Sequence, residues 1–178
     1  MLRLILVRHA KSSWDEPELA DYDRPLNARG REAAPRMGEF LAERWLIPTR
    51  ILCSAAQRAR ETLASMLPAF GGDIDIRVAA RLYDADAPGY LEAIREFGGT
   101  DLTLMLIGHN PATEDLAQVL APIGDAAGLE AMKGKYPTAG VAVIGFETAA
   151  WRDIGPGGGT LLSFHTPKSI VGDMPVQE

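Results

Sequence analysis

In the stretch "LRLILVRHA" (residues 2–10), a strongly apolar segment runs straight into an arginine and a histidine. Residues 2–7 are mostly leucine, isoleucine and valine, and a short run of this kind is typical of a buried β-strand. The strand then ends at Arg8 and His9. Either it has reached the surface there, or its carboxyl end carries two reactive side chains into a functional site.

The rest of the chain indicates what surrounds this strand. Apolar residues repeat every three or four positions between further short apolar runs, which lie at residues 49–54, 74–79 and 102–107. Strands that alternate with helices predict a mostly parallel sheet covered on both faces. After residue 135 two apolar runs, 139–147 and 159–166, follow each other without a helical segment between them. They predict antiparallel strands added at an edge, in a three-layer α/β/α fold.

Size, charge and cysteine content limit the class of protein. A chain of 178 residues with 47% apolar and 24% charged residues predicts one globular domain spanning residues 1–178. The net charge of −6 argues against a nucleic-acid partner or a membrane surface, because either favours a basic face. Cys53 is the only cysteine, which excludes an internal disulfide and fits a reducing compartment. The opening apolar run is too short for a spanning helix or a signal peptide, so we expect a cytoplasmic protein.

The residues that follow the predicted strands share one chemistry. In open α/β sheets, ligands bind beyond the carboxyl ends of the strands. The first strand is followed by Arg8 and His9, the second by "SAAQR" with Arg58, and the fourth by "GHNP" with His109. Two of the three histidines and two arginines are therefore expected at the same edge of the sheet. Each of these residues alone is more typical of an ordinary structural position, but together they predict a site.

The local sequence also predicts helix starts at this edge. Ser54 is expected to be an N-cap with Gln57 three residues later, and Asn110 an N-cap followed by Pro111. Helix N-termini favour anions, and forked guanidinium donors match the oxygens of a tetrahedral dianion such as phosphate. No metal site is predicted, because the histidines and the lone cysteine lack the close pairing typical of zinc ligands.

Four motifs carry a family resemblance. They occur in the order "LVRHA", "RPLNARG", "CSAAQRARET" and "LIGHNP", cover nearly the whole chain, and together resemble the histidine phosphatase superfamily, which is phosphoglycerate-mutase-like in fold. The short chain and "GHNP" resemble the SixA-type phosphohistidine phosphatases within it. Two positions depart from the family pattern: Ala10 stands where glycine is usual, and Ala55 where proline is usual.

The resemblance implies roles for the residues at the strand ends. His9 would be the nucleophile that forms a phosphohistidine intermediate. Arg8, Arg58 and His109 would bind the phosphoryl oxygens and stabilise the charge that develops during transfer. Arg24, in "DRPL", either lies at this pocket as a further substrate-binding residue or forms an ion pair with a neighbouring aspartate, Asp21 or Asp23. No metal or other cofactor is implied.

The expected substrate depends on whether the site contains a general acid. Larger members of the family carry an inserted segment with a catalytic carboxylate, whereas here "RLYDADAPGYLEAI" (81–94) passes almost directly into a helical pattern. Asp84 is a candidate acid, although it and Asp86 fit turn or capping positions equally well. An imidazole leaving group needs little protonation, because its ordinary pKa is near 6.5. We therefore predict a phosphohistidine-bearing protein as substrate, with a small phosphorylated molecule as the alternative.

Three other functions fit the sequence less well. A cysteine phosphatase needs five residues between its cysteine and arginine, but only four separate Cys53 from Arg58. A mutase would need a site for a second phosphate, and no basic insert supplies one. A non-catalytic phosphate-binding module would keep the arginines but would not need His9.

The third histidine, His165, lies at the end of the last apolar run and is interpreted as an ordinary strand-end residue.

Overall fold

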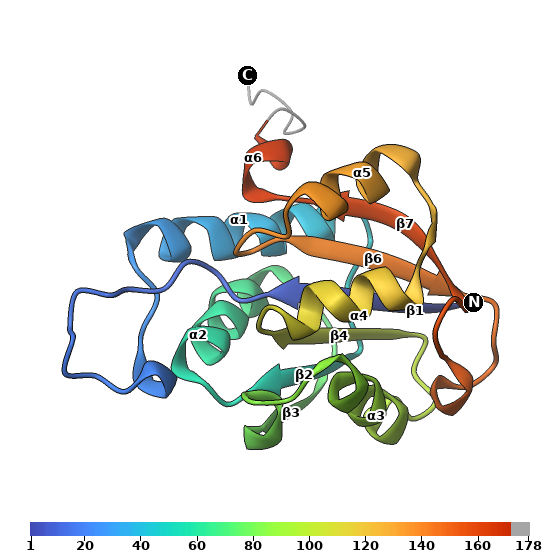
Figure 1. Cartoon of the computed structure of the whole chain (residues 1–178), viewed down its shortest axis with the longest axis horizontal. Coiled ribbons are helices and arrows are strands. Elements are labelled where there is room, and N and C mark those ends of the chain that lie inside the picture. Colours follow the sequence, from blue (N-terminus) through green and yellow to red (C-terminus); the bar gives the residue numbers. More distant parts are fainter. Residues whose placement is uncertain (172–178) are drawn as a thin grey trace.

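The computed structural model describes residues 1–171. Within that range, seven strands form one sheet in the order β3-β2-β4-β1-β6-β7-β5 (Figure 1). The strands are β1 (Leu2–Arg8), β2 (Arg50–Ser54), β3 (Asp75–Ala79), β4 (Thr103–Gly108), β5 (Ile123–Gly124), β6 (Val141–Phe146) and β7 (Gly159–His165). The helices are α1 (Ala28–Glu43), α2 (Gln57–Met66), α3 (Ala87–Phe97), α4 (Ala112–Leu120), α5 (Ala126–Gly134) and α6 (Pro167–Ile170).

The pairing of the strands confirms the predicted fold class. β3, β2, β4 and β1 are parallel neighbours, as expected from the alternation of strands and helices. β6 runs antiparallel to both β1 and β7, and the short β5 pairs in parallel with β7. Because two reversals restore the original direction, β7 runs the same way as β1. The carboxyl ends of β2, β4, β1 and β7 therefore lie along one edge of the sheet.

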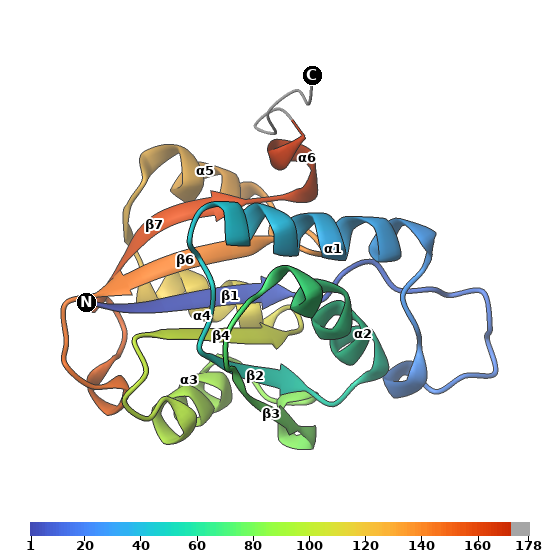
Figure 2. The ribbon, with the colours of Figure 1, turned by 180° about the vertical axis from the view of Figure 1, so that it is seen from behind.

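Helices cover both faces of the sheet. α3, α4 and α5 lie on the face turned to the viewer in Figure 1, and α1 and α2 lie on the opposite face, seen in Figure 2. The side chains of β1 follow this division, since Leu4 and Leu6 belong to one buried cluster and Ile5 and Val7 to the other. A strand buried on both faces needs apolar residues at every position, which is why "LILV" shows no alternation.

The long connection between β1 and α1 projects beyond the arrowhead of β1 (Figure 1). Its two ends lie side by side, because the amide of Asn27 donates to the carbonyl of Lys11 at 3.0 Å and Ser12 forms a bridge with Leu26. Gly30, in the first turn of α1, packs directly against the Lys11 carbonyl, where a Cβ atom would collide with the backbone. Glycine at this position therefore lets the connection close against α1.

Among residues 1–171, no helix is both long enough and apolar enough to cross a membrane. The longest helix, α1, has 16 residues and carries several charged side chains.

Candidate active site

His9 lies immediately after β1, at the carboxyl edge of the sheet, and its side chain is buried. Its Nδ1 is 2.7 Å from the carbonyl oxygen of Ala10, so the ring must carry its proton there to donate. Its other ring nitrogen, Nε2, is 3.3 Å from Nε of Arg58, an N–H group that can only donate. The two contacts select the Nδ1–H tautomer and leave the lone pair on Nε2.

Burial, together with the neighbouring His109, Arg58 and Arg8, lowers the pKa of His9 to about 3, against the opposing effect of the Ala10 carbonyl. The imidazole is therefore neutral at physiological pH, which is the form in which a histidine can act as a nucleophile.

We expect nuclear magnetic resonance of the ¹⁵N-labelled protein to show His9 neutral and protonated at Nδ1 from pH 8 down to about pH 5. An unperturbed histidine would be half protonated near pH 6.5 in the same titration. The pKa of His9 is lowered because burial disfavours the charged form of the ring, so protonation occurs only at lower pH. A midpoint near 6.5, or a ring protonated at Nε2, would contradict the assigned tautomer.

Arg58 lies in the first turn of α2, as the sequence predicts, and is 6% exposed. Besides the contact with His9, its Nη1 donates to the backbone oxygen of Asp21 at 2.6 Å and its Nη2 to Oδ2 of Asp21 at 3.0 Å. These bonds use three of the five guanidinium N–H groups. Two donors therefore remain for a ligand while Asp21 holds the side chain in place.

Asp21, predicted only as a possible ion-pair partner of Arg24, also contacts Arg58 at the site. Its carboxylate also accepts a hydrogen bond from the Tyr83 hydroxyl at 2.7 Å. The Tyr83 hydrogen bond, together with Arg58 and Arg24, lowers the pKa of Asp21 to about 2, although the side chain is 45% exposed. Asp21 therefore stays charged near neutral pH and connects two arginines and a tyrosine at this edge of the sheet.

Arg24 forms the ion pair that was one of its two predicted roles. Its guanidinium lies 3.0 Å from Oδ1 of Asp21, donates to the Ser12 hydroxyl at 2.8 Å, and stacks over the ring of Trp14 at 3.5 Å. Asp21 thus links Arg24 to Arg58, and Arg24 supports the site from within the β1–α1 connection.

His109 follows β4, and its ring centroid is 5.1 Å from that of His9. Its Nε2 is 2.7 Å from the hydroxyl of the fully buried Ser54, which also accepts from the amide of Ala56 at 3.3 Å. No other acceptor for the Ser54 hydroxyl occurs in the described part of the chain, so we assign its proton to the bond with Nε2 and the His109 proton to Nδ1. Nδ1 is buried and has no hydrogen-bond partner within the described part of the chain. Burial and Arg58 lower the pKa of His109 to about 4, so this ring too is neutral.

Both predicted N-caps were wrong. α2 begins at Gln57 with Ala56 as its N-cap, because the Ser54 hydroxyl lies against His109 instead of a helix amide three residues on. α4 begins only after Pro111, and the Asn110 amide donates to Glu114 at 2.9 Å and to the carbonyl of Tyr136 at 3.2 Å. The two side chains that the sequence pattern predicts as N-caps instead form hydrogen bonds elsewhere in the fold.

The carbonyl of Tyr136 also accepts a hydrogen bond from Nη1 of the half-buried Arg8, at 2.8 Å. The Nε of Arg8 is buried and makes no hydrogen bond within residues 1–171.

Ala10 follows His9 in the chain. Its amide donates a hydrogen bond to the Thr62 hydroxyl at 2.9 Å, and its methyl group packs with Leu26, Ala34 and Ala139. The alanine that replaces the usual glycine is thus accommodated in a small apolar cluster.

Asp84 differs from the other predicted site residues. It is exposed, follows Tyr83 in the chain, and makes no hydrogen bond with any part of the chain that the structure describes. Asp86 has the capping role considered for it, since its carboxylate accepts from the amide of Gly89 at 3.0 Å and begins α3. Direct contacts therefore join His9 with Arg58, whereas Asp84 lies outside this network.

Two other chemistries find little support in the geometry. Burial raises the pKa of the Cys53 thiol to about 12, so it stays protonated and unreactive near neutral pH. Over residues 1–171, no group of three or more histidine, cysteine, aspartate or glutamate side chains is arranged to hold a metal ion.

Comparison with known proteins identifies the family. The model of the histidine phosphatase superfamily (branch 1) matches residues 4–96, more than half of the chain, and this range contains His9 and Arg58. The chain belongs to the histidine phosphatase superfamily. An uncharacterized protein of Mycobacterium tuberculosis is 42% identical over 165 residues, which are 91% of this chain and 100% of that protein.

Solved structures of the superfamily share the fold. A candidate phosphohistidine phosphatase SixA from Agrobacterium tumefaciens has a TM-score of 0.77 at 32% identity, covering 93% of this chain and 98% of its own. The protein histidine phosphatase SixA complexed with tungstate has a TM-score of 0.73 at 21% identity, covering 95% and 99% respectively. The predicted resemblance to SixA-type members of the superfamily is thereby confirmed.

Proposed function

We propose that this member of the histidine phosphatase superfamily removes the phosphoryl group from phosphohistidine on a protein, through a phosphohistidine intermediate on His9. The observation that carries the proposal is the state of His9: a neutral ring, held at Nδ1 by the Ala10 carbonyl, with the Nε2 lone pair beside Arg58.

In the first step, Nε2 of His9 attacks the phosphorus atom. A bond forms between Nε2 and phosphorus while the P–N bond of the substrate breaks. The electron pair of the P–N bond returns to the substrate nitrogen, and the substrate ring, protonated on its other nitrogen, leaves as a neutral imidazole. Arg58 has two unused N–H donors, and the buried Nε of Arg8 and Nδ1 of His109 lack partners within the described range. Phosphoryl oxygens would supply the missing acceptors, and their growing charge would strengthen these bonds in the transition state.

In the second step, water attacks the phosphorus of the intermediate and the P–Nε2 bond breaks, which returns the electron pair to His9. The Ala10 carbonyl keeps a proton on Nδ1, so the phosphorylated ring carries a positive charge and leaves as a neutral imidazole. One water proton stays on the phosphate product and the other passes to a phosphate oxygen or to solvent. The second step therefore requires no separate acid to protonate His9.

Two features favour phosphohistidine over a phosphate ester. The loop between Leu82 and α3 is only four residues long, and its carboxylates are an exposed Asp84 and the capping Asp86. An ester must expel an alkoxide and benefits from a general acid by about 10²–10⁴-fold, whereas imidazole is a much better leaving group. The name of the relative from Agrobacterium tumefaciens agrees with this substrate class.

The test compares kcat/KM for a histidine-phosphorylated carrier protein with kcat/KM for an aryl phosphate. We expect kcat/KM to be at least about 10²-fold higher for the phosphohistidine. This is the smallest rate loss expected for an ester when no general acid protonates its leaving group. Preference for the aryl phosphate would identify a general phosphomonoesterase instead. Phosphate binding without turnover of either substrate would identify a non-catalytic binding module.

Replacing Asp84 with asparagine should leave kcat/KM for the phosphohistidine carrier within about threefold of wild type, because the carboxylate is exposed and outside the hydrogen-bond network of His9. Asp86→Asn is a suitable control, since asparagine also caps helices. A fall of 10²-fold or more in Asp84→Asn, absent from Asp86→Asn, would show that Asp84 is a general acid.

A further inference from the structure

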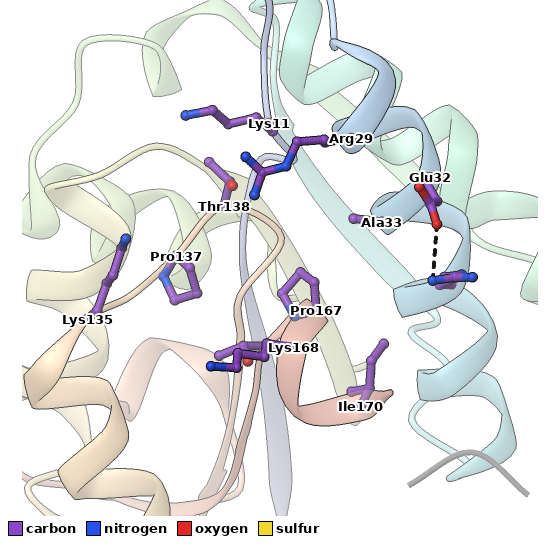
Figure 3. A pocket seen from close by; sticks show the side chains of 12 residues that line it. Lys11, Arg29, Glu32, Ala33, Lys135, Pro137, Thr138, Pro167, Lys168 and Ile170 are labelled. Carbon is purple, nitrogen blue, oxygen red and sulfur yellow. Dashed lines mark ion pairs between the residues drawn. The ribbon is translucent and has the colours of Figure 1, made fainter. Parts of the chain in front are cut away.

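A cavity of about 660 Å³ lies beside the candidate active site, between α1, α6 and the segment that precedes β6 (Figure 3). Five basic side chains line it, namely Lys11, Arg29, Arg36, Lys135 and Lys168. Among the described residues of the lining, Glu32 is the one acidic side chain, and it forms an ion pair with Arg36 at 3.2 Å. We call this feature the basic pocket.

The charge of the basic pocket contrasts with that of the whole protein. Its lining residues within 1–171 carry a net charge of +4, whereas the whole chain carries −6. Within residues 1–171, four of its basic side chains have neither an ion-pair nor a hydrogen-bond partner, namely Lys11, Arg29, Lys135 and Lys168. Like charges gathered without counter-charges repel one another, and they attract and orient an anionic partner.

The basic pocket adjoins the active site along the same edge of the sheet. Lys11 is two residues beyond His9, and Lys135 precedes Tyr136, whose carbonyl binds Arg8. Lys168 follows β7, which ends at the same edge as β1. Figure 3 shows Lys11, Lys135 and Lys168 around one hollow. A partner that inserts a phosphorylated side chain toward His9 would therefore cover this pocket too.

The chemistry of the lining indicates the kind of partner. The basic residues are all exposed, while the remaining lining includes the apolar Ala33, Pro137, Pro167 and Ile170. A small polyanion is usually held by buried, preorganised donors. Exposed cations around an apolar floor instead match a protein surface, on which acidic residues surround an apolar side chain.

We propose that the basic pocket docks an acidic surface next to the phosphohistidine of the protein substrate. This inference rests on the proposed function and adds the charge of the partner: Lys11, Arg29, Lys135 and Lys168 bind its carboxylates, while the apolar floor receives a neighbouring apolar side chain. The pocket then determines how well a phosphoprotein binds, while Arg8, Arg58 and His109 act on the phosphoryl group itself.

The experiment measures kcat/KM of Lys168→Glu and of the double variant Lys135→Glu/Lys168→Glu. The substrates are an acidic histidine-phosphorylated carrier protein and phosphoramidate, which has the P–N bond but no protein surface. Arg152→Glu is the matched control, because Arg152 is 82% exposed and lies in the connection between β6 and β7, at the opposite edge of the sheet. All three variants are checked for folding by thermal denaturation.

We expect the double variant to lose about tenfold in kcat/KM on the carrier protein, through KM, and to show a weaker dependence on salt concentration. Its activity on phosphoramidate and the activity of Arg152→Glu on both substrates should stay within about twofold of wild type. Unchanged activity on the carrier, an equal loss on phosphoramidate, or an equal loss in Arg152→Glu would each overturn the docking role alone. Failure of the wild type to act on the carrier while it hydrolyses phosphoramidate would overturn the proposed function and the docking role with it.

Discussion

Replacement of His9 by alanine is expected to reduce kcat on phosphoramidate by about 10⁴–10⁶-fold, as removal of a covalent nucleophile does in other enzymes. His109 cannot replace His9 as the nucleophile. Its Nε2 is bound to Ser54, and its unpartnered Nδ1 carries a proton instead of a lone pair. Steady-state rates of the purified variant, with circular dichroism to confirm the fold, provide the measurement.

Two controls make this expectation specific. His165→Ala removes a histidine at the end of β7 whose ring contacts Phe40 edge-on, and it should leave kcat within about threefold of wild type. Added imidazole should partly restore the activity of His9→Ala, because it can enter the space of the lost ring and supply the missing nitrogen. If His9→Ala kept a wild-type rate, the covalent mechanism would be wrong.

Replacement of Arg58 by alanine is expected to cost about 10²–10³-fold in kcat/KM, with a large part of the loss in kcat. Arg58 contributes a donor at His9, two spare donors for phosphoryl oxygens and the contacts that hold Asp21. Lysine at this position should recover only a small part of the activity, because a single ammonium group cannot reproduce the forked geometry.

The matched control for Arg58 is Arg60→Ala, two residues along the same helix. Arg60 is exposed, and its Nε donates to the carbonyl of Ala55 at 2.9 Å, away from His9. We expect Arg60→Ala to stay within about threefold of wild type in kcat/KM. A variant Arg58→Ala with reduced thermal stability but normal kcat/KM would show that Arg58 is structural.

The fold was predictable because its signals are local. The run "LILV" within β1 is apolar at every position, and this pattern belongs to a strand covered on both faces. The same reasoning placed Arg8, His9, Arg58 and His109 at one edge, since parallel strands bring their carboxyl ends together. The sequence motifs then identified the superfamily that the comparisons confirm.

The parts that could not be predicted depend on contacts between distant segments. Asp21 meets Arg58 across 37 positions and Tyr83 across 62, and it lies in a single 3₁₀ turn (Asp21–Asp23) of the β1–α1 connection, where the sequence has no periodic pattern. Ser54 has the sequence context of an N-cap, and only the packing of β2 beside β4 shows that its hydroxyl reaches His109. The basic pocket is likewise assembled from four separate segments, in which each lysine or arginine alone has the pattern of an ordinary surface residue.

The central claim, a phosphohistidine on His9, is tested most directly by trapping the intermediate. The protein is mixed with ³²P-labelled phosphohistidine carrier, quenched in alkali within milliseconds, and digested for mass spectrometry. The account predicts label that is stable to base, labile to acid and confined to the peptide that contains His9, with none in His9→Ala. Turnover of the carrier without any label on His9 at the shortest quench times would contradict it.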